Sequence, residues 1–176
     1  MIHSTLGLVH LTTALAALLL GIPVFLRPKL TTTHRVLGYV YSVSMATMLV
    51  TALSIYYLTG AFNFLHGFAI LSSIQLGKGL YHAIARQPTG AWLAFHYRWM
   101  TWSYTGLCAA LIAESSTRIV MPYLRDHHGI QSFGWFWGIL AVATYVVIAA
   151  GQYLEKRNRG ILKGYSEALR IRTETP

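Results

Sequence analysis

The sequence contains few charged residues and only one cysteine. Charged side chains make up 11% of its 176 residues, hydrophobic side chains make up 55%, and the mean hydropathy is +0.48. A soluble domain carries roughly 25% charged residues, so the composition excludes an ordinary soluble domain. The single cysteine, Cys108, lies inside an apolar run. It therefore excludes both a disulfide framework and a thiolate metal site.

The motifs of several enzyme classes are also missing. The chain has no HExxH, no CxxC and no phosphate-cradling glycine loop, and nothing resembles a serine or cysteine nucleophile with its base. The net charge of +9 does not by itself indicate nucleic acid, because its meaning depends on where the basic residues lie in the topology.

Long apolar runs are abundant, and five of them are long enough to cross a bilayer. A transmembrane helix needs about 20 apolar residues, and an open strand cannot satisfy its backbone in lipid. The sequence therefore predicts an all-α integral membrane protein whose membrane domain covers residues 1–154. Its first four helices are expected to form a bundle. The five predicted transmembrane helices lie near residues 6–26, 36–58, 62–85, 92–112 and 133–154.

The basic residues gather on one side of this predicted topology. Of the 14 lysines and arginines, all but Arg118 and Arg125 lie in or beside the first connection, beside the third connection, or in the tail of residues 155–176. By the positive-inside rule, the N-terminus is expected outside and the tail in the cytoplasm. Topology then accounts for the net charge without nucleic acid. The basic tail is expected to be either a short helix on anionic headgroups or a solvated segment.

The histidines form two predicted layers at membrane depth, where ionisable residues are costly and mark functional sites by default. His10 and His66 are expected near the outer ends of the first and third helices. His34 and His96 are expected at the inner ends of the second and fourth helices. A four-helix bundle of this kind is predicted to hold one pair near each surface: His10 with His66 outside, and His34 or His82 with His96 inside.

Neutral imidazole is a common ligand of haem iron, zinc and copper. Opposed histidines in a membrane bundle suit haem b, which needs an apolar slot and an arginine for its propionates. Arg35 and Arg98 adjoin the inner histidines. Zinc or copper requires three or more converging ligands. The predicted haem ligands are His10, His34, His66 and His96, and the candidates for zinc or copper are His34, His82 and His96.

Other interpretations of these residues remain open. A lone histidine at a helix end is often an interfacial hydrogen-bonding residue. A transporter using Lys78, His82 and Glu114 as an ion path is a third hypothesis, but no pair of proline-broken helices supports it. Glu114 and Arg118 are four residues apart and are expected to form an ion pair.

Two segments carry a resemblance to a known family: "HRVLGYVYSVSM" from His34 and "HYRWMTWSY" from His96. Together they resemble the DUF2306 family of small bacterial membrane proteins, over roughly the first 120 residues. The resemblance implies a multi-pass protein of the bacterial cytoplasmic (inner) membrane, but no established activity. In layout the family is similar to cytochrome b561-like and ferric-reductase-like haem proteins, although a fold does not fix a function. The matching positions are His34, Arg35, Gly38, Tyr41, Ser44, Met45, His96, Trp99, Met100, Ser103, Tyr104 and Arg118.

The sequence therefore favours a histidine-ligated haem protein that passes electrons between a quinol-type donor and an acceptor. Haem b is the expected cofactor, with zinc or copper as the alternative. The expected partners are the lipid bilayer and a quinol or redox partner protein, and no nucleic acid is expected. The competing hypothesis is a non-enzymatic accessory subunit or assembly factor whose histidines are structural.

Overall fold

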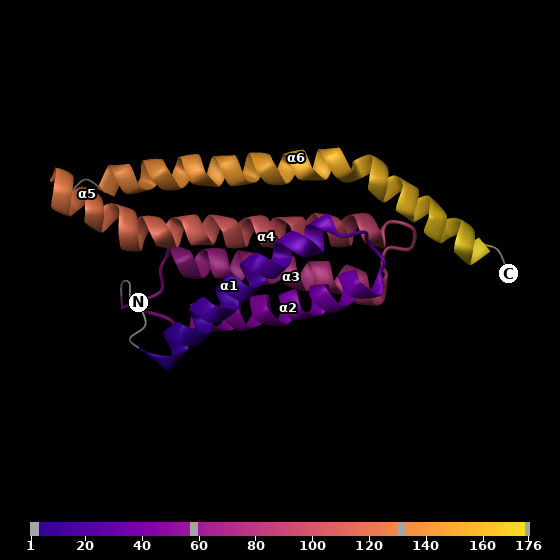
Figure 1. Cartoon of the computed structure of the whole chain (residues 1–176), viewed down its shortest axis with the longest axis horizontal. Coiled ribbons are helices and arrows are strands. Elements are labelled where there is room, and N and C mark those ends of the chain that lie inside the picture. The colour runs from indigo at the N-terminus through magenta and orange to yellow at the C-terminus, as the bar shows by residue number, and fades with distance from the viewer. Residues whose placement is uncertain (1–3, 57–59, 130–132, 175–176) are drawn as a thin grey trace. The chain divides into compact units, whose positions relative to one another are not determined.

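The computed structural model describes residues 4–56, 60–129 and 133–174, and every regular element in this part of the chain is helical (Figure 1). The predicted all-helical class is thus confirmed for the described residues. In order, the elements are α1 (Thr5–Leu26), α2 (Thr32–Leu53), α3 (Phe64–Ala85), α4 (Trp92–Ser115), the π-helical segment η1 (Ser116–Val120), α5 (Met121–His128) and α6 (Phe133–Glu174).

A helix occupies each of the five segments predicted to cross the membrane, but α2 ends earlier than expected. Its predicted segment extended to residue 58, whereas the helix stops at Leu53. The Ser54 amide donates to the Thr51 carbonyl, and the Ile55 amide donates to the Ala52 carbonyl. Such i→i+3 bonds tighten the last turn of a helix. Residues 57 and 58 lie outside the described residues.

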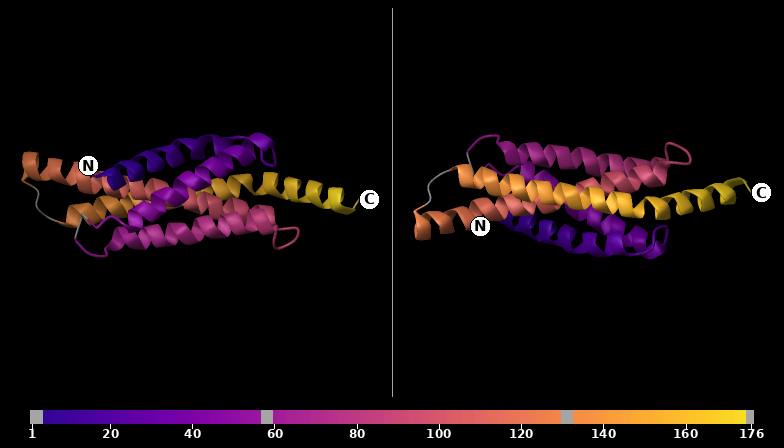
Figure 2. Two further views of the ribbon diagram at one scale, coloured as in Figure 1. Left: turned by 90° about the horizontal axis from the view of Figure 1, so that it is seen from below. Right: turned by 90° about the horizontal axis from the view of Figure 1, so that it is seen from above.

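The helix α6 continues well beyond residue 154, where the fifth predicted segment ends. It covers 42 residues, and Figures 1 and 2 show it extending past the loop that precedes α4, with a bend toward its C-terminal end. The sequence after Leu154 is rich in Glu, Lys, Arg and Leu and has no proline before the final residue. These residue types have high helix propensity, so the basic tail extends the helix.

Among the described residues, three helical segments are long and apolar enough to cross a membrane by length and composition. They are Thr5–Leu26, Thr32–Leu53 and Trp137–Gly160. Large apolar side chains on them are exposed: 65% of Leu19 and 67% of Val43. Extensive exposed apolar surface of this kind is typical of membrane contact. The helices α3 and α4 have similar lengths but are not among these segments.

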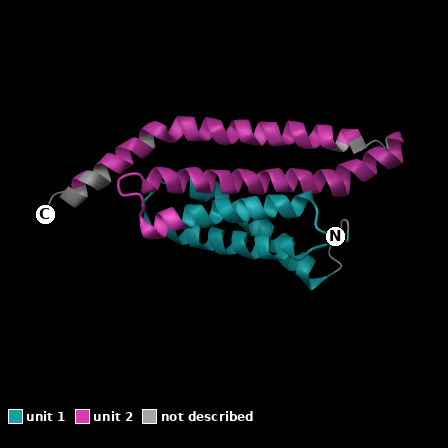
Figure 3. Cartoon of the chain, turned by 180° about the vertical axis from the view of Figure 1, so that it is seen from behind, with its two compact units in different colours: residues 1–80 teal, residues 81–176 magenta. Residues whose placement is uncertain are grey.

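The chain divides into two compact units, residues 1–80 and 81–176 (Figure 3). In the first unit α1 packs against α2. The buried face of α1 consists of Ala17, Gly21 and Val24, and that of α2 includes Tyr41 and Met45. Small residues such as Ala17 and Gly21 let two helix backbones approach closely. The predicted four-helix bundle combines helices of both units and stays a prediction.

In the second unit α4 packs against α6. The Tyr97 hydroxyl of α4 accepts a hydrogen bond from Asn158 Nδ2 at 2.6 Å and donates to the Leu154 carbonyl at 3.4 Å. Farther along the same pair of helices, a Cβ added to buried Gly151 would lie 3.0 Å from Thr105 Cγ2. A tyrosine hydrogen bond and a close glycine contact therefore hold α4 and α6 together.

Lys29 closes the connection between α1 and α2. Its Nζ donates to the carbonyl oxygens of Val24 and Phe25 at 2.9 and 2.8 Å, and it lies 5.7 Å from the centroid of the Phe25 ring. A cation at a helix C-terminus stabilises the last carbonyl groups. Burial, in contrast, disfavours the charged form of the amine and lowers the pKa of Lys29 from its ordinary 10.5 to about 8.

We expect Gly151→Leu to destabilise the second unit, because its side chain would displace Thr105, whose hydroxyl is bonded to the Trp102 carbonyl at 3.0 Å. Overpacking of this kind costs roughly 1–3 kcal/mol. Gly138→Leu is the matched control on the same helix, since an added Cβ there meets nothing within 4 Å. Thermal unfolding in detergent, monitored by dye labelling of Cys108, measures the difference in stability. Equal melting temperatures for the two variants would contradict the proposed close contact.

We expect the Lys29 amine to titrate near pH 8 in the folded protein, because burial favours its neutral form. Between pH 8 and about 10.5 the unfolded chain then binds more protons at this residue than the folded chain does. The contribution of Lys29 to the free energy of unfolding therefore rises with pH across that window. The pH dependence of Lys29 acylation, quantified by peptide mass spectrometry, gives the midpoint. The SDS-unfolded chain is the control, and identical midpoints in both states would refute the shift.

Candidate functional site

The histidines predicted to bind a cofactor are divided between the two units. His10, His34 and His66 belong to residues 1–80, whereas His82 and His96 belong to residues 81–176. The predicted outer pair thus lies within one unit. Of the predicted inner pairs, His34 with His96 combines the two units, whereas His82 with His96 lies within one unit. Both inner pairs stay predictions.

His10 connects α1 to the C-terminal part of α2. Its Nδ1 lies 3.2 Å from the Met48 carbonyl oxygen and 3.1 Å from Thr51 Oγ1. A carbonyl oxygen can only accept, so Nδ1 carries the proton and the neutral ring keeps its lone pair on Nε2. Histidines that bind metals usually donate their other ring N–H to a carbonyl or carboxylate in this way. The ring of His10 is therefore oriented as a ligand histidine would be.

His66 has the opposite hydrogen-bonding pattern, because it takes part in the N-terminal cap of α3. The Asn63 side chain accepts the amide hydrogen of Leu65 at 3.0 Å, and His66 Nδ1 accepts the amide hydrogen of Asn63 at 3.3 Å. This is a capping box in which histidine takes the place usually held by Glu or Gln. The acceptor role of Nδ1 places the proton of the neutral ring on Nε2.

Aromatic rings surround His66 and complete its burial. The ring stacks on Tyr56 with centroids 4.7 Å apart and lies 4.9 Å from the centroid of Phe62. Only 3% of the residue is exposed, and its Nε2 has no hydrogen-bond partner among the described residues. His66 thus combines a capping function with a buried N–H donor.

His34 and Arg35 lie in the first turn of α2. The backbone amide of His34 donates to Thr31 Oγ1 at 3.1 Å, which makes Thr31 the N-cap of the helix. The His34 side chain is half-buried and Arg35 is exposed. The structure therefore places this arginine beside the helix start, as the sequence order requires, and the contacts described here assign it no anionic partner.

His82 and His96 lie near the connection between α3 and α4. His82 Nδ1 is hydrogen-bonded to the Gln87 carbonyl, and its ring stacks on Phe95 with centroids 5.1 Å apart. His96 follows Phe95 and is half-buried. Within the described ranges, no three His, Cys, Asp or Glu side chains converge to hold a metal ion. The zinc or copper set of His34, His82 and His96 stays a prediction.

Glu114 and Arg118 form the ion pair expected from their spacing, with Arg118 Nε 2.9 Å from Glu114 Oε1. The pair joins the end of α4 to η1, a π-helical segment of five residues. Short π-helical segments within helices are often found at functional sites. Both side chains are about one-third exposed, so the ion pair contributes little to the stability of the fold.

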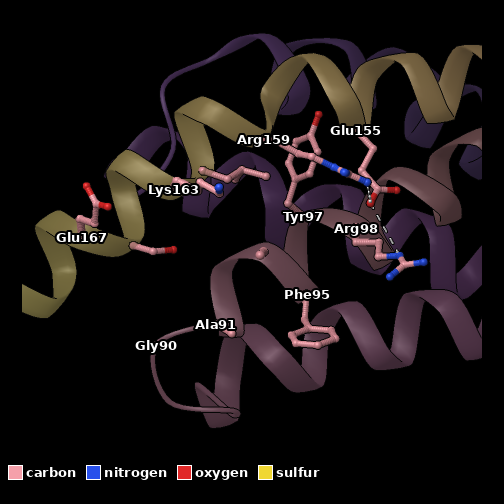
Figure 4. Close-up of a pocket in the computed structure, with 12 residues that line it drawn as sticks. Gly90, Ala91, Phe95, Tyr97, Arg98, Glu155, Arg159, Lys163 and Glu167 are labelled. Carbon is pink, nitrogen blue, oxygen red and sulfur yellow. Dashed lines mark ion pairs between the residues drawn. The ribbon is translucent and has the colours of Figure 1, made fainter.

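A pocket of about 600 Å³ opens between the start of α4 and the extension of α6 (Figure 4). Arg98, the predicted partner of a haem propionate, lines this pocket, with its Nε 3.9 Å from Glu155 Oε1. Arg159 Nη2 approaches the same oxygen at 3.7 Å. Tyr97, Glu155 and Arg159 were not predicted as site residues from the sequence. The available signal was the spacing of four between Glu155 and Arg159 on one helix face.

We expect His66→Gln to be more stable than His66→Ala by about 1 kcal/mol, which is the typical contribution of one capping hydrogen bond. Glutamine accepts the Asn63 amide in an ordinary capping box, whereas alanine leaves it unpaired. Both variants lose the stacking on Tyr56, so alanine is the matched control for glutamine. Thermal unfolding in detergent, followed by circular dichroism, measures the order. A glutamine variant no more stable than the alanine variant would argue against the capping function.

Comparison with known proteins identifies the family. No curated protein and no solved structure is significantly similar to the chain. A family model described as a predicted membrane protein, DUF2306, matches residues 7–153. The match takes in His10, both histidine-arginine segments and the three helical segments able to cross a membrane, apart from their outermost residues. The chain therefore belongs to the DUF2306 family of predicted membrane proteins.

Proposed function

We propose that the protein is a b-type haem protein of the membrane that passes electrons, with His10 as one of its iron ligands. The observation that carries this proposal is the hydrogen bond of His10 Nδ1 with the Met48 carbonyl. It fixes the tautomer whose Nε2 lone pair is suited to bind iron. A bound haem would supply reversible one-electron chemistry.

The residues around His10 would have two functions in such a protein. The Met48 carbonyl and Thr51 hydroxyl hold the imidazole at a fixed orientation on α2. Met48 and Thr51, which contact the ring, are themselves buried, and this limits access of water on that side. A proton on Nδ1 that donates to a carbonyl raises the basicity of the ring and strengthens its bond to a metal.

His66 fits the second ligand position less well than His10 fits the first. Its Nδ1 accepts the Asn63 amide, so its Nε2 carries a proton. To bind iron through Nε2, the ring would have to change tautomer and give up this capping bond. The proposal therefore assigns the first ligand to His10 and leaves His34, His66 and His96 as candidates for the second. Zinc or copper held by His34, His82 and His96 is the alternative cofactor.

The proposed topology has five membrane-crossing helices, the N-terminus outside and the C-terminus in the cytoplasm of a bacterium. Its support is the distribution of 12 of the 14 basic residues on one side and a helix in each predicted segment. In this topology α1 to α4 form the bundle, and a quinol or a redox protein is the electron donor.

A non-enzymatic accessory subunit or assembly factor is the second candidate. Two observations favour it, because they give histidines structural functions. His66 caps α3, and His82 is hydrogen-bonded to the Gln87 carbonyl at the end of the same helix. Histidines that complete helix ends need no cofactor to explain them.

We expect His10→Asn to abolish haem binding while leaving the fold intact. The asparagine side chain can place an N–H donor where Nδ1 lies and so keep the bond to Met48, but it offers no ring nitrogen to iron. The measurement is the Soret band of protein purified after expression with ample haem. Circular dichroism of the same sample reports the fold. His66→Gln is the matched control, since it keeps the capping bond and removes the imidazole.

Three outcomes separate the candidate functions. Pigment lost in His10→Asn and kept in His66→Gln supports a haem ligated by His10 and not by His66. Pigment lost in both variants identifies both histidines as ligands. Wild-type protein without a Soret band overturns the haem proposal, and partner capture that is unaffected by either variant then favours the accessory subunit.

A further inference from the structure

The pocket between α4 and α6 has an arginine-rich end and one largely apolar wall. Figure 4 shows Tyr97, Arg98, Glu155 and Arg159 gathered at one end and Glu167 at the other, with Lys163 between them. The wall on the α4 side is formed by apolar residues, namely Gly90, Ala91, Ala94 and Phe95. A volume of about 600 Å³ is typical of pockets that bind small ligands. The pocket therefore suits an amphiphile.

The arginine-rich end has an excess of cations. Arg98 and Arg159 both approach Glu155 Oε1, at 3.9 and 3.7 Å, which is beyond hydrogen-bond distance. The Glu155 side chain is only 19% exposed, whereas the two arginine side chains are 59% and 65% exposed. One carboxylate thus orients two guanidinium groups without using all their donors, since each guanidinium carries five N–H groups. Lys163 adds a third cation beside them.

Tyr97 and Asn158 hold the two sides of the pocket in place. The hydrogen bond between their side chains, at 2.6 Å, joins α4 to α6 next to the arginines. Arg98 follows Tyr97 in sequence and Arg159 follows Asn158. The cations are therefore presented by adjoining positions on two helices that are fixed to one another, which reduces the entropy lost when both bind one anion.

The position of the pocket along α6 indicates which kind of anion it would meet. The apolar segment Trp137–Gly160 ends between Arg159 and Lys163, so the pocket lies where this segment would leave the hydrocarbon. Basic residues at this depth meet the headgroups of anionic lipids. Guanidinium groups bind phosphate oxygens in bidentate fashion, and the apolar wall suits the glycerol and acyl part of a lipid.

We propose that this pocket binds a phosphate-bearing anionic group, and that its source is the headgroup of a membrane lipid. Arg98 and Arg159 bind the phosphate oxygens, Lys163 contributes charge, and Glu155 orients the two arginines toward one point. This site does not depend on the haem proposal, which is carried by His10 on α1, although the sequence also made Arg98 a candidate partner of a haem propionate.

The test is native mass spectrometry of the full chain in detergent with added phosphatidylglycerol or phosphatidylcholine. The expected result is preferential binding of phosphatidylglycerol. Each basic residue near a membrane surface contributes about fivefold in affinity, so Arg98→Gln with Arg159→Gln is expected to lower the affinity about 25-fold. The matched control is Lys156→Gln with Arg157→Gln, which removes two charges from α6 outside the pocket lining. Glu155→Gln is expected to increase binding, because it removes the competing carboxylate.

The outcomes decide both the site and the source of the phosphate. Equal losses in the two double variants, or equal binding of the two lipids, would overturn the proposal in favour of a general basic surface. Displacement of the lipid by millimolar inorganic phosphate would identify a soluble phosphate as the source and refute the lipid assignment. Circular dichroism checks the fold of each variant, and Arg159→Gln alone tests the site if the double variant does not fold.

Discussion

A polar group within an apolar helix must find its hydrogen-bond partner inside the protein, because lipid offers none. This constraint shapes the described structure. Serine and threonine hydroxyls repeatedly donate to the carbonyl four residues earlier in their own helix. Other polar groups of the described residues are paired across helices. Examples of the hydroxyl bonds are Thr12 to Leu8, Thr13 to Val9, Ser42 to Gly38, Thr47 to Val43, Ser73 to Ala69 and Ser116 to Ile112.

Two of the bonds between helices determine the candidate sites. His10 reaches the end of α2 through the Met48 carbonyl, and Tyr97 reaches α6 through Asn158. Each bond pairs the polar group of a side chain with a residue of another helix and so fixes the orientation of that side chain. The first bond orients an imidazole, and the second aligns two arginine-bearing segments. The same requirement for a hydrogen-bond partner thus underlies a proposed cofactor ligand and a proposed lipid site.

The helices were largely predictable because their apolar composition is local information. The ion pair of Glu114 with Arg118 was predictable for the same reason, since a spacing of four residues brings them together on any helix. The contact of His10 with Met48 was not, because 38 residues separate them and only tertiary packing brings them together. The extension of α6 was underestimated because hydropathy falls at Leu154 while helix propensity does not.

The capping function of His66 was detectable in the sequence but had an unfamiliar form. A polar residue followed three positions later by an acceptor is the pattern of a capping box, and Asn63 with His66 fits it if histidine serves as the acceptor. The pocket was harder to detect, because Arg98 and Arg159 are 61 positions apart. A spacing rule relates residues of one helix and gives no information about which face of another helix lies opposite.

His10 and His66 show why residue type and expected depth are insufficient to assign a ligand. The sequence assigned both to one predicted outer layer, yet one meets a carbonyl and the other an amide. A carbonyl partner leaves the lone pair on Nε2, and an amide partner leaves a proton there. The two rings therefore have opposite chemistry at the nitrogen that would face a cofactor. Identical ligation by both would require a tautomer change that releases Asn63, so the symmetry of the sequence does not extend to the chemistry of the pair.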